Sequence, residues 1–146
     1  MKRHTSLQPL SRDHHGALIL ARLLQKDAPD YKGLPTDIPG KIIYAQEFYA
    51  EDLVQHFQEE EEVLKLVTGT SDQLDAMIAT IFAEHEKLHG LFAGIVNNPD
   101  ISVHLDSIGR ELEMHIRKEE RELFPLIEET CDERTMVRIG EYLSSH

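Results

Sequence analysis

Residues 71–95 have the sequence SDQLDAMIATIFAEHEKLHGLFAGI. The large apolar residues of this segment recur every three or four positions, which places them on one face of an α-helix: Leu74, Ile78, Ile81, Leu88, Phe92 and Ile95. Ser71 or Asp72 is expected to cap the helix, because a short polar side chain there accepts a hydrogen bond from a free backbone N–H. The segment therefore predicts a long amphipathic helix with one buried face.

Three other segments have the same apolar spacing, and loops rich in Pro, Gly and Asn near 28–40, 68–71 and 97–100 separate the four. Ser11 is a candidate cap of the first helix. Pro125 is expected to break or kink the fourth, because proline lacks a backbone N–H. A short helix is expected around 133–143. The sequence thus predicts an all-α fold, an antiparallel up-down four-helix bundle with a short C-terminal helix, in a single domain over residues 1–146.

Composition and charge exclude several classes of function. The chain has 146 residues, of which 40% are hydrophobic, and a formal net charge of −12, which would repel a nucleic-acid backbone. No apolar run is long enough to suggest a membrane span or the core of a signal peptide, so no membrane partner is expected. The single cysteine, Cys131, excludes an internal disulfide and a Cys-rich metal site and fits a reducing cytoplasm.

Four of the nine histidines lie on the predicted core stripes, one on each helix: His14, His56, His85 and His115. A lone histidine in a core is usually structural and hydrogen-bonded to a carbonyl. His14, however, lies about 20 Å before the end of its helix, at a rise of about 1.5 Å per residue. The other three lie about 21 to 24 Å after the start of theirs, which places all four in one layer of an up-down bundle. Independent structural histidines have no reason to meet in one layer, whereas the ligands of a metal site do.

Carboxylates accompany the histidines at helical spacing. Glu60 follows His56 by four residues and Glu119 follows His115 by four, so each pair shares a helix face. A buried glutamate is costly unless a charge or a metal compensates it. The two H-x-x-x-E segments repeat each other, which predicts ligands related by a pseudo-twofold axis, as in a two-metal centre. His15 remains an alternative to His14, and Glu120 an alternative to Glu119.

This ordered set resembles the hemerythrin family and the wider group of hemerythrin-like HHE cation-binding domains, over about residues 10–126. The matching pattern is a histidine on the first helix, H-x-x-x-E on the second, H-x-x-x-H on the third and a histidine with a downstream carboxylate on the fourth: His14, His56 with Glu60, His85 with His89, and His115 with Glu119 or Glu120. The oxygen carriers have an aspartate five residues after the last histidine, which favours Glu120, whereas the match to Glu60 favours Glu119.

The resemblance implies a non-haem di-iron site. His85, His89 and His115 would bind one iron ion, and His14 and His56 the other. Glu60 and Glu119 would bridge the two ions, together with an oxo or hydroxo group. O2 or a related diatomic would bind at an open coordination position, for oxygen binding, sensing or storage. This set of imidazoles and carboxylates suits iron. No acid–base or nucleophile set stands apart from the ligands, so the interpretation is a metal- and oxygen-binding protein rather than an enzyme.

Other interpretations of the same residues stay open. Residues 85–89 form H-E-x-x-H, the signature of zinc metalloproteases, with Glu86 as general base. That interpretation leaves His14, His56 and His115 unexplained. A ferritin-like oxidase would use Glu-x-x-His on two helices, and only Glu86 and His89 have that form. A metal-free helical interaction protein is the third alternative. Asp52 and Glu111, each four residues before a histidine, are candidates for orienting an imidazole.

Overall fold

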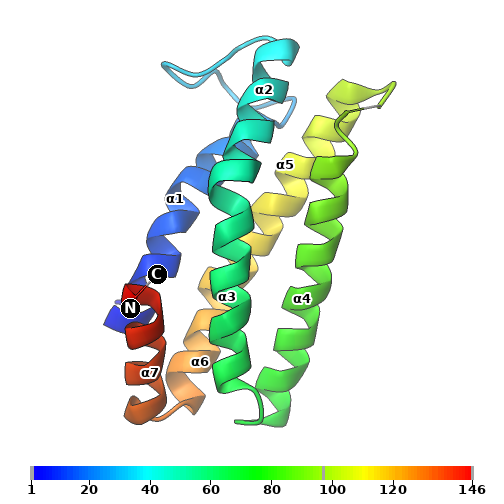
Figure 1. The fold of residues 1–146 in the computed structure, drawn as a ribbon. Coiled ribbons are helices and arrows are strands. Elements are labelled where there is room, and N and C mark those ends of the chain that lie inside the picture. The colour runs from blue at the N-terminus through cyan, green and yellow to red at the C-terminus, as the bar shows by residue number, and fades with distance from the viewer. Residues whose placement is uncertain (1, 97, 146) are drawn as a thin grey trace.

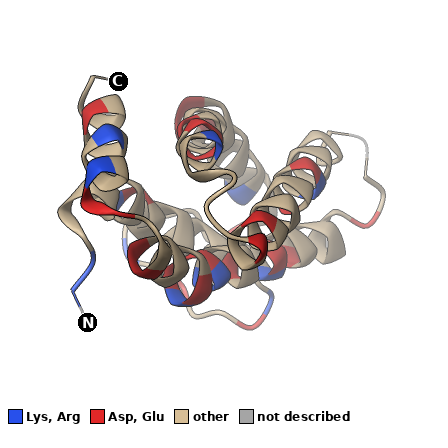
Figure 2. Ribbon diagram, turned by 90° about the horizontal axis from the view of Figure 1, so that it is seen from below, with Lys and Arg blue, Asp and Glu red and all other residues tan. Residues whose placement is uncertain are grey.

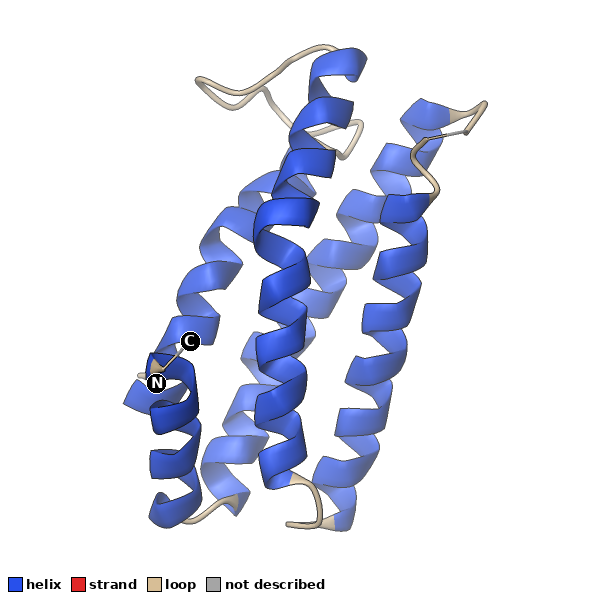
Figure 3. Cartoon of the chain, in the orientation of Figure 1, coloured by secondary structure: helices blue, strands red, loops and turns tan. Residues whose placement is uncertain are grey.

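The computed structural model describes residues 2–96 and 98–145, which are helical throughout apart from loops and turns (Figures 1 and 3). No strand occurs among these residues, so the prediction of an all-α fold is confirmed. The α-helices are α1 (Gln8–Leu23), α2 (Ile38–Phe48), α3 (Val54–Val67), α4 (Asp72–Ala93), α5 (Ile101–Lys118), α6 (Phe124–Thr130) and α7 (Glu133–Ser144). Three shorter helical turns are η1 (Thr5–Leu7), η2 (Tyr49–Leu53) and η3 (Glu119–Leu123).

The helices form a bundle of long rods lying side by side (Figure 1). The π-helical turn η2 joins α2 and α3 into one rod, and the π-helical turn η3 joins α5 and α6 into another. α1 packs against α5, and α7 packs against α3 and η1, so the two ends of the described chain lie near each other. Within the described ranges, no helix combines the length and the apolar character needed to span a membrane.

Two apolar clusters fill the core, and a polar layer divides them along every long rod. On α1, Leu10 belongs to the first cluster and Ala17 to the second, with His14 between them. On α4, Ile81 and Leu88 belong to different clusters, with His85 between them. The same change occurs at Glu60 on α3 and at Glu119 after α5. The apolar stripes therefore hold the polar layer in place from both sides.

The predicted caps met different outcomes. Ser71 caps α4 by accepting a hydrogen bond from Leu74 N at 3.1 Å, as expected. The prediction for Ser11 was wrong, because α1 begins at Gln8, directly after η1, and Ser11 lies inside the helix. Pro9 is tolerated in the first turn, where backbone N–H groups have no helical partner. The hydroxyl of Ser11 instead donates to Glu120 Oε2 at 2.8 Å.

The rod of α5 and α6 is interrupted near Pro125, as expected, and the interruption is a π-helical turn. Phe124 N bonds to Glu119 O, five residues back, so η3 holds one residue more than an α-helical turn. Pro125 then lies in the first turn of α6, where its missing N–H costs least. Glu119, the first residue of η3, is fully buried. The expected short C-terminal helix is α7, capped by Asp132.

The surface carries the negative charge. Figure 2 shows Asp and Glu distributed over the helices of the bundle, with fewer Lys and Arg among them. This pattern agrees with the formal net charge of −12. Acidic residues also reach the interior, where two glutamates lie in the polar layer.

Candidate metal centre

Six buried polar side chains meet in the layer between the two apolar clusters. They come from α1, α3, α4, α5 and η3, and none is more than 5% exposed: His14, His56, Glu60, His85, His115 and Glu119. We call these six residues the ligand cluster. Every one of them was predicted from the sequence as a metal ligand. The positions of the histidines along the helices and the four-residue spacing of the glutamates were sufficient to find them.

The ligand cluster divides into two groups of four that share both glutamates. One group is His14, His56, Glu60 and Glu119; the other is His85, His115, Glu60 and Glu119. Within each group the donor atoms all lie within 4.8 Å of one another. Ligand atoms bound at about 2.1 Å to a common ion lie at most about 4.2 Å apart, so little adjustment is needed for each group to hold one cation.

Each glutamate directs one oxygen to each group. Glu60 Oε1 lies 2.9 Å from His85 Nε2, and Glu60 Oε2 lies 3.5 Å from His56 Nε2. Glu119 Oε1 lies 2.9 Å from His14 Nε2, and Glu119 Oε2 lies 2.9 Å from His115 Nε2. A carboxylate with its two oxygens directed in this way can bridge two neighbouring cations.

Several donor atoms of the ligand cluster are buried without a hydrogen-bond partner in the described protein. They are the Nε2 atoms of His14, His56 and His115, Oε2 of Glu60, and both carboxylate oxygens of Glu119. Some of these atoms lie close to each other, yet their geometry is not that of a hydrogen bond. A buried polar atom without a partner costs free energy. A cation at each group would satisfy these atoms, so the residues present fit a two-metal site.

A second set of carboxylates holds the opposite nitrogen of each imidazole. His14 Nδ1 lies 2.6 Å from Glu120, and His56 Nδ1 lies 3.0 Å from Asp13. The same contact is 2.7 Å for His85 with Glu61 and 2.7 Å for His115 with Glu84. We call Asp13, Glu61, Glu84 and Glu120 the outer carboxylates. An Nδ1–H that donates to a carboxylate leaves Nε2 as the free donor atom, which is the arrangement typical of metal-binding histidines.

The outer carboxylates connect the helices in a closed ring. Asp13 of α1 contacts the histidine of α3, and Glu61 of α3 contacts the histidine of α4. Glu84 of α4 contacts the histidine of α5, and Glu120 of η3 contacts the histidine of α1. Each outer carboxylate is adjacent in sequence to a residue of the ligand cluster. The pseudo-twofold repeat seen in the sequence thus extends beyond the ligands.

The carboxylates control the protonation of the imidazoles. Burial by itself lowers the pKa of a histidine, but contacts with Asp13 and Glu60 raise the pKa of His56 to about 10. Burial also lowers the pKa of the other three histidines, and nearby carboxylates again outweigh it. The pKa of His85 and of His115 is raised to about 10, and that of His14 to about 9. Burial would raise the pKa of Glu119, but the charge of His115 holds it well below its ordinary value. A cation binding here must displace protons.

His89 lies outside both groups. It is half-buried, and its Nδ1 lies 2.5 Å from Tyr49 Oη. Phe57 stacks on His85 with ring centroids 4.3 Å apart and meets His89 edge-on at 5.4 Å. Leu88, the residue before His89, occupies the buried position on the next turn of α4. The structure therefore does not gather His89 with the other predicted ligands.

The alternatives left open by the sequence take distinct positions. His15 is exposed on α1, whereas His14 lies in the ligand cluster. Glu120 contacts His14 from outside, whereas Glu119 is fully buried inside the cluster. Glu86, the general base of the protease interpretation, is exposed. The structure thus gathers His14 and Glu119, the residues ranked first from the sequence.

Asp52 and Glu111 do not contact the histidines they were expected to orient. Asp13 and Glu84 make those contacts instead, and Glu111 accepts a hydrogen bond from Lys87 at 2.9 Å. The Nδ1 atoms face the neighbouring helix, so a carboxylate on the same helix cannot take that role. An acidic residue beside an inward-facing one is the sequence signal that would have identified the outer carboxylates, because adjacent residues on a helix point about 100° apart.

Comparison with known proteins gives one match. The family model described as hemerythrin HHE cation binding domain matches residues 5–127. No curated protein and no solved structure matches the chain. The matched range contains the whole ligand cluster and all four outer carboxylates.

Proposed function

The chain belongs to the family of hemerythrin HHE cation-binding domains, and from this premise we propose that it holds two non-haem iron ions and binds O2 or a related diatomic. The observation that carries the proposal is the pair of ligand groups that share Glu60 and Glu119. His14 and His56 would bind one ion, and His85 and His115 the other. The two glutamates would bridge them.

The donor set supports iron. Imidazole and carboxylate together suit iron, whereas a soft thiolate donor is absent from both groups. Four protein ligands on each ion leave coordination positions for a small ligand. Bound iron would supply the electrons that attach a diatomic there. The apolar clusters on both sides would limit the access of water to that position.

The protein's own residues prepare the site for two cations. The outer carboxylates fix each imidazole with Nε2 facing inward. Glu84 and Glu120 are themselves held by positively charged side chains, since Lys118 donates a hydrogen bond to Glu84 and Arg3 donates one to Glu120. The positions of the ligands thus depend on packing and ion pairs that exist in the protein without a metal.

The partnerless donor atoms favour this function over a metal-free helical protein. In a metal-free protein, these buried atoms would lower the stability of the fold and no bound ion would compensate for the loss. We further propose that the four rods form an antiparallel up-down bundle, with α7 as its short C-terminal helix. A single domain over residues 1–146 and a cytoplasmic location, the latter suggested by the one cysteine, stay predictions.

Optical spectroscopy tests the proposed function. The iron-loaded protein should show charge-transfer bands in air that bleach on anaerobic reduction. Bands that return on adding O2 and disappear again when O2 is removed would support diatomic binding. An irreversible return to the plain oxidised spectrum would favour a redox or sensing role. Iron-loaded protein without such bands would contradict a bridged di-iron site.

A further inference from the structure

The ligand cluster is closed to solvent, so a cation needs a route to it. All six of its residues are buried, and two of them are fully enclosed glutamates. A metal site buried in this way requires an access path through the surrounding side chains. Such a path matters only if the proposed function holds, because it concerns how the same site is filled.

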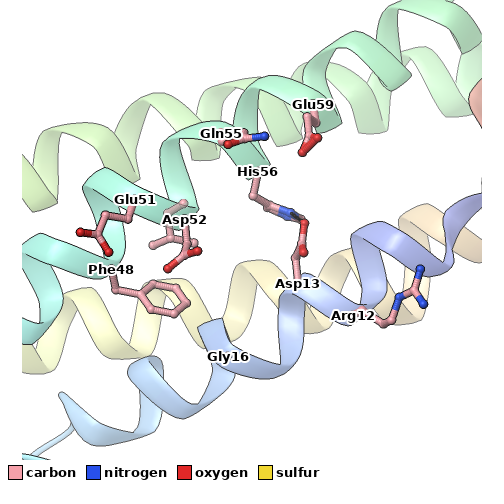
Figure 4. Close-up of a pocket in the computed structure, with 10 residues that line it drawn as sticks. Arg12, Asp13, Gly16, Phe48, Glu51, Asp52, Gln55, His56 and Glu59 are labelled. Atoms are coloured by element: carbon pink, nitrogen blue, oxygen red, sulfur yellow. Dashed lines mark hydrogen bonds and ion pairs between the residues drawn. The ribbon is translucent and has the colours of Figure 1, made fainter. Parts of the chain in front are cut away.

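One cavity reaches the ligand cluster from outside. It has a volume of about 380 Å³ and lies between α1 and the rod formed by α2 and α3 (Figure 4). His56 forms part of its wall, and in Figure 4 the imidazole extends from α3 toward Asp13 of α1. The imidazole of His56 is 5% exposed, and its Nε2 is one of the partnerless donor atoms. One member of the ligand cluster therefore forms part of the cavity wall.

The cavity is strongly acidic. Asp13, Glu51, Asp52 and Glu59 line it, and Arg12 is the one Lys or Arg among its lining residues. Glu51, Asp52 and Glu59, which we call the cavity acids, have no ion-pair partner in the described part of the chain. Uncompensated negative charge in a concave site raises the local concentration of cations and their rate of association.

Of the four outer carboxylates, Asp13 is also the most exposed. The side chain of Asp13 is 49% exposed, compared with 30% for Glu120, 27% for Glu61 and 22% for Glu84. Glu84 and Glu120 are additionally held by Lys118 and Arg3, whereas the hydrogen-bond partner of Asp13 among the described residues is His56 alone. Asp13 and His56 can therefore separate without breaking other ion pairs.

We propose that this cavity is the route by which a divalent cation reaches the ligand cluster. The cavity acids attract the hydrated cation, and Asp13 is the first carboxylate it meets beside His56. Rotation of His56 away from Asp13 opens the wall. The cation then exchanges water for the Nε2 atoms and carboxylates inside.

The test compares rates of metal uptake by the metal-free protein, with Co²⁺ as the probe and its visible absorption as the signal. The cavity variant is Glu51→Gln, Asp52→Asn and Glu59→Gln together. The matched control is Glu86→Gln, Glu129→Gln and Glu141→Gln, which removes the same charge from exposed positions outside the cavity. None of the six residues belongs to the ligand cluster or to the outer carboxylates.

The cavity variant should take up Co²⁺ about tenfold more slowly than the unaltered protein, by loss of electrostatic attraction. Its final Co²⁺ content should be unchanged, and its rate should depend less on salt. The control variant should load at nearly the normal rate. Equal rates for the cavity variant and the unaltered protein, or equal slowing by the control, would overturn the route alone. Failure of the unaltered protein to bind Co²⁺ or Fe²⁺ would overturn the proposed function and the route together.

Discussion

Glu60 and Glu119 each belong to both ligand groups, with one carboxylate oxygen directed to either side. They come from different rods and are both fully buried. Two buried carboxylates this close to each other would repel strongly without positive charge between them. In the metal-free protein the protonated imidazoles supply that charge. In the proposed function two cations supply it.

Removing one bridging carboxylate should affect both metal positions. We expect Glu60→Gln to lower the metal content from two ions per chain to less than one, because each group loses a charged ligand. Glu62→Gln is the control, since Glu62 is exposed and pairs with Lys65. Metal analysis after reconstitution and desalting checks this. Loss of only one ion would show that Glu60 serves a single group.

Variants of His115 and His89 distinguish the ligand group seen in the structure from the set of three histidines predicted from the sequence. His115→Ala should lose at least one ion, because His115 Nε2 lies among the donor atoms of that group. His89→Ala should retain both ions, since Tyr49 holds His89 apart from the cluster. His15→Ala, at an exposed position, is the control. Loss of an ion from His89→Ala would restore the sequence-based assignment of three histidines to one iron.

The outer carboxylates should act on metal affinity through the imidazoles. We expect Glu84→Gln to weaken binding by about 10- to 100-fold, the usual range for a partner of a metal-bound histidine. Glu84→Asp should restore part of the affinity, and Glu111→Gln, on the neighbouring helix, should have no effect. Competition with a chelator of known affinity measures the change. Unchanged affinity in Glu84→Gln would show that the contact with His115 only stabilises the fold.

The pH dependence of the metal-free protein should differ from that of the loaded protein. The pKa values of His56, His85 and His115 in the folded state are about 10, above the value of about 6.5 for an unfolded chain. These groups bind more protons when folded, so their stabilisation is complete below about pH 6.5 and is lost as pH rises through about 10.

Thermal unfolding of the metal-free protein should therefore show a Tm that falls between about pH 6.5 and 10. In the loaded protein the imidazoles carry metal instead of protons, so this fall should be smaller, and metal uptake at pH 7 should release protons to an indicator dye. Equal pH dependence in both forms, together with no proton release, would contradict the protonated state inferred for the metal-free cluster.

Much of the site could be predicted because it obeys the periodicity of helices. His14, His56, His85 and His115 interrupt apolar stripes at similar depths, and the two glutamates follow at i+4. His89 was also placed at i+4, but the stripe on α4 continues through Leu88 and Phe92, which take the buried positions. Spacing alone could not decide between these neighbours, because the rotation of α4 depends on its packing.

Features that depend on contacts between helices were not predictable. The ring of outer carboxylates requires knowing which rod faces which, and Asp13 and Glu61 carry no signal in their own segments beyond their place beside a ligand. The π-helical turns at Tyr49–Leu53 and Glu119–Leu123 have no apolar period of their own, so the spacing of apolar residues did not predict them. Only a break or kink near Pro125 was expected. The cavity beside Asp13 and His56 likewise arises only from the packing of α1 against the rod of α2 and α3.

The metal content of the intact chain tests the central claim most directly. Protein reconstituted anaerobically with Fe²⁺, freed of unbound metal and analysed for iron and protein together should contain two irons per chain. Native mass spectrometry should show the same two ions on one chain, because both ligand groups lie within it. One iron per chain, or none after reconstitution, would contradict a centre in which Glu60 and Glu119 bridge two ions.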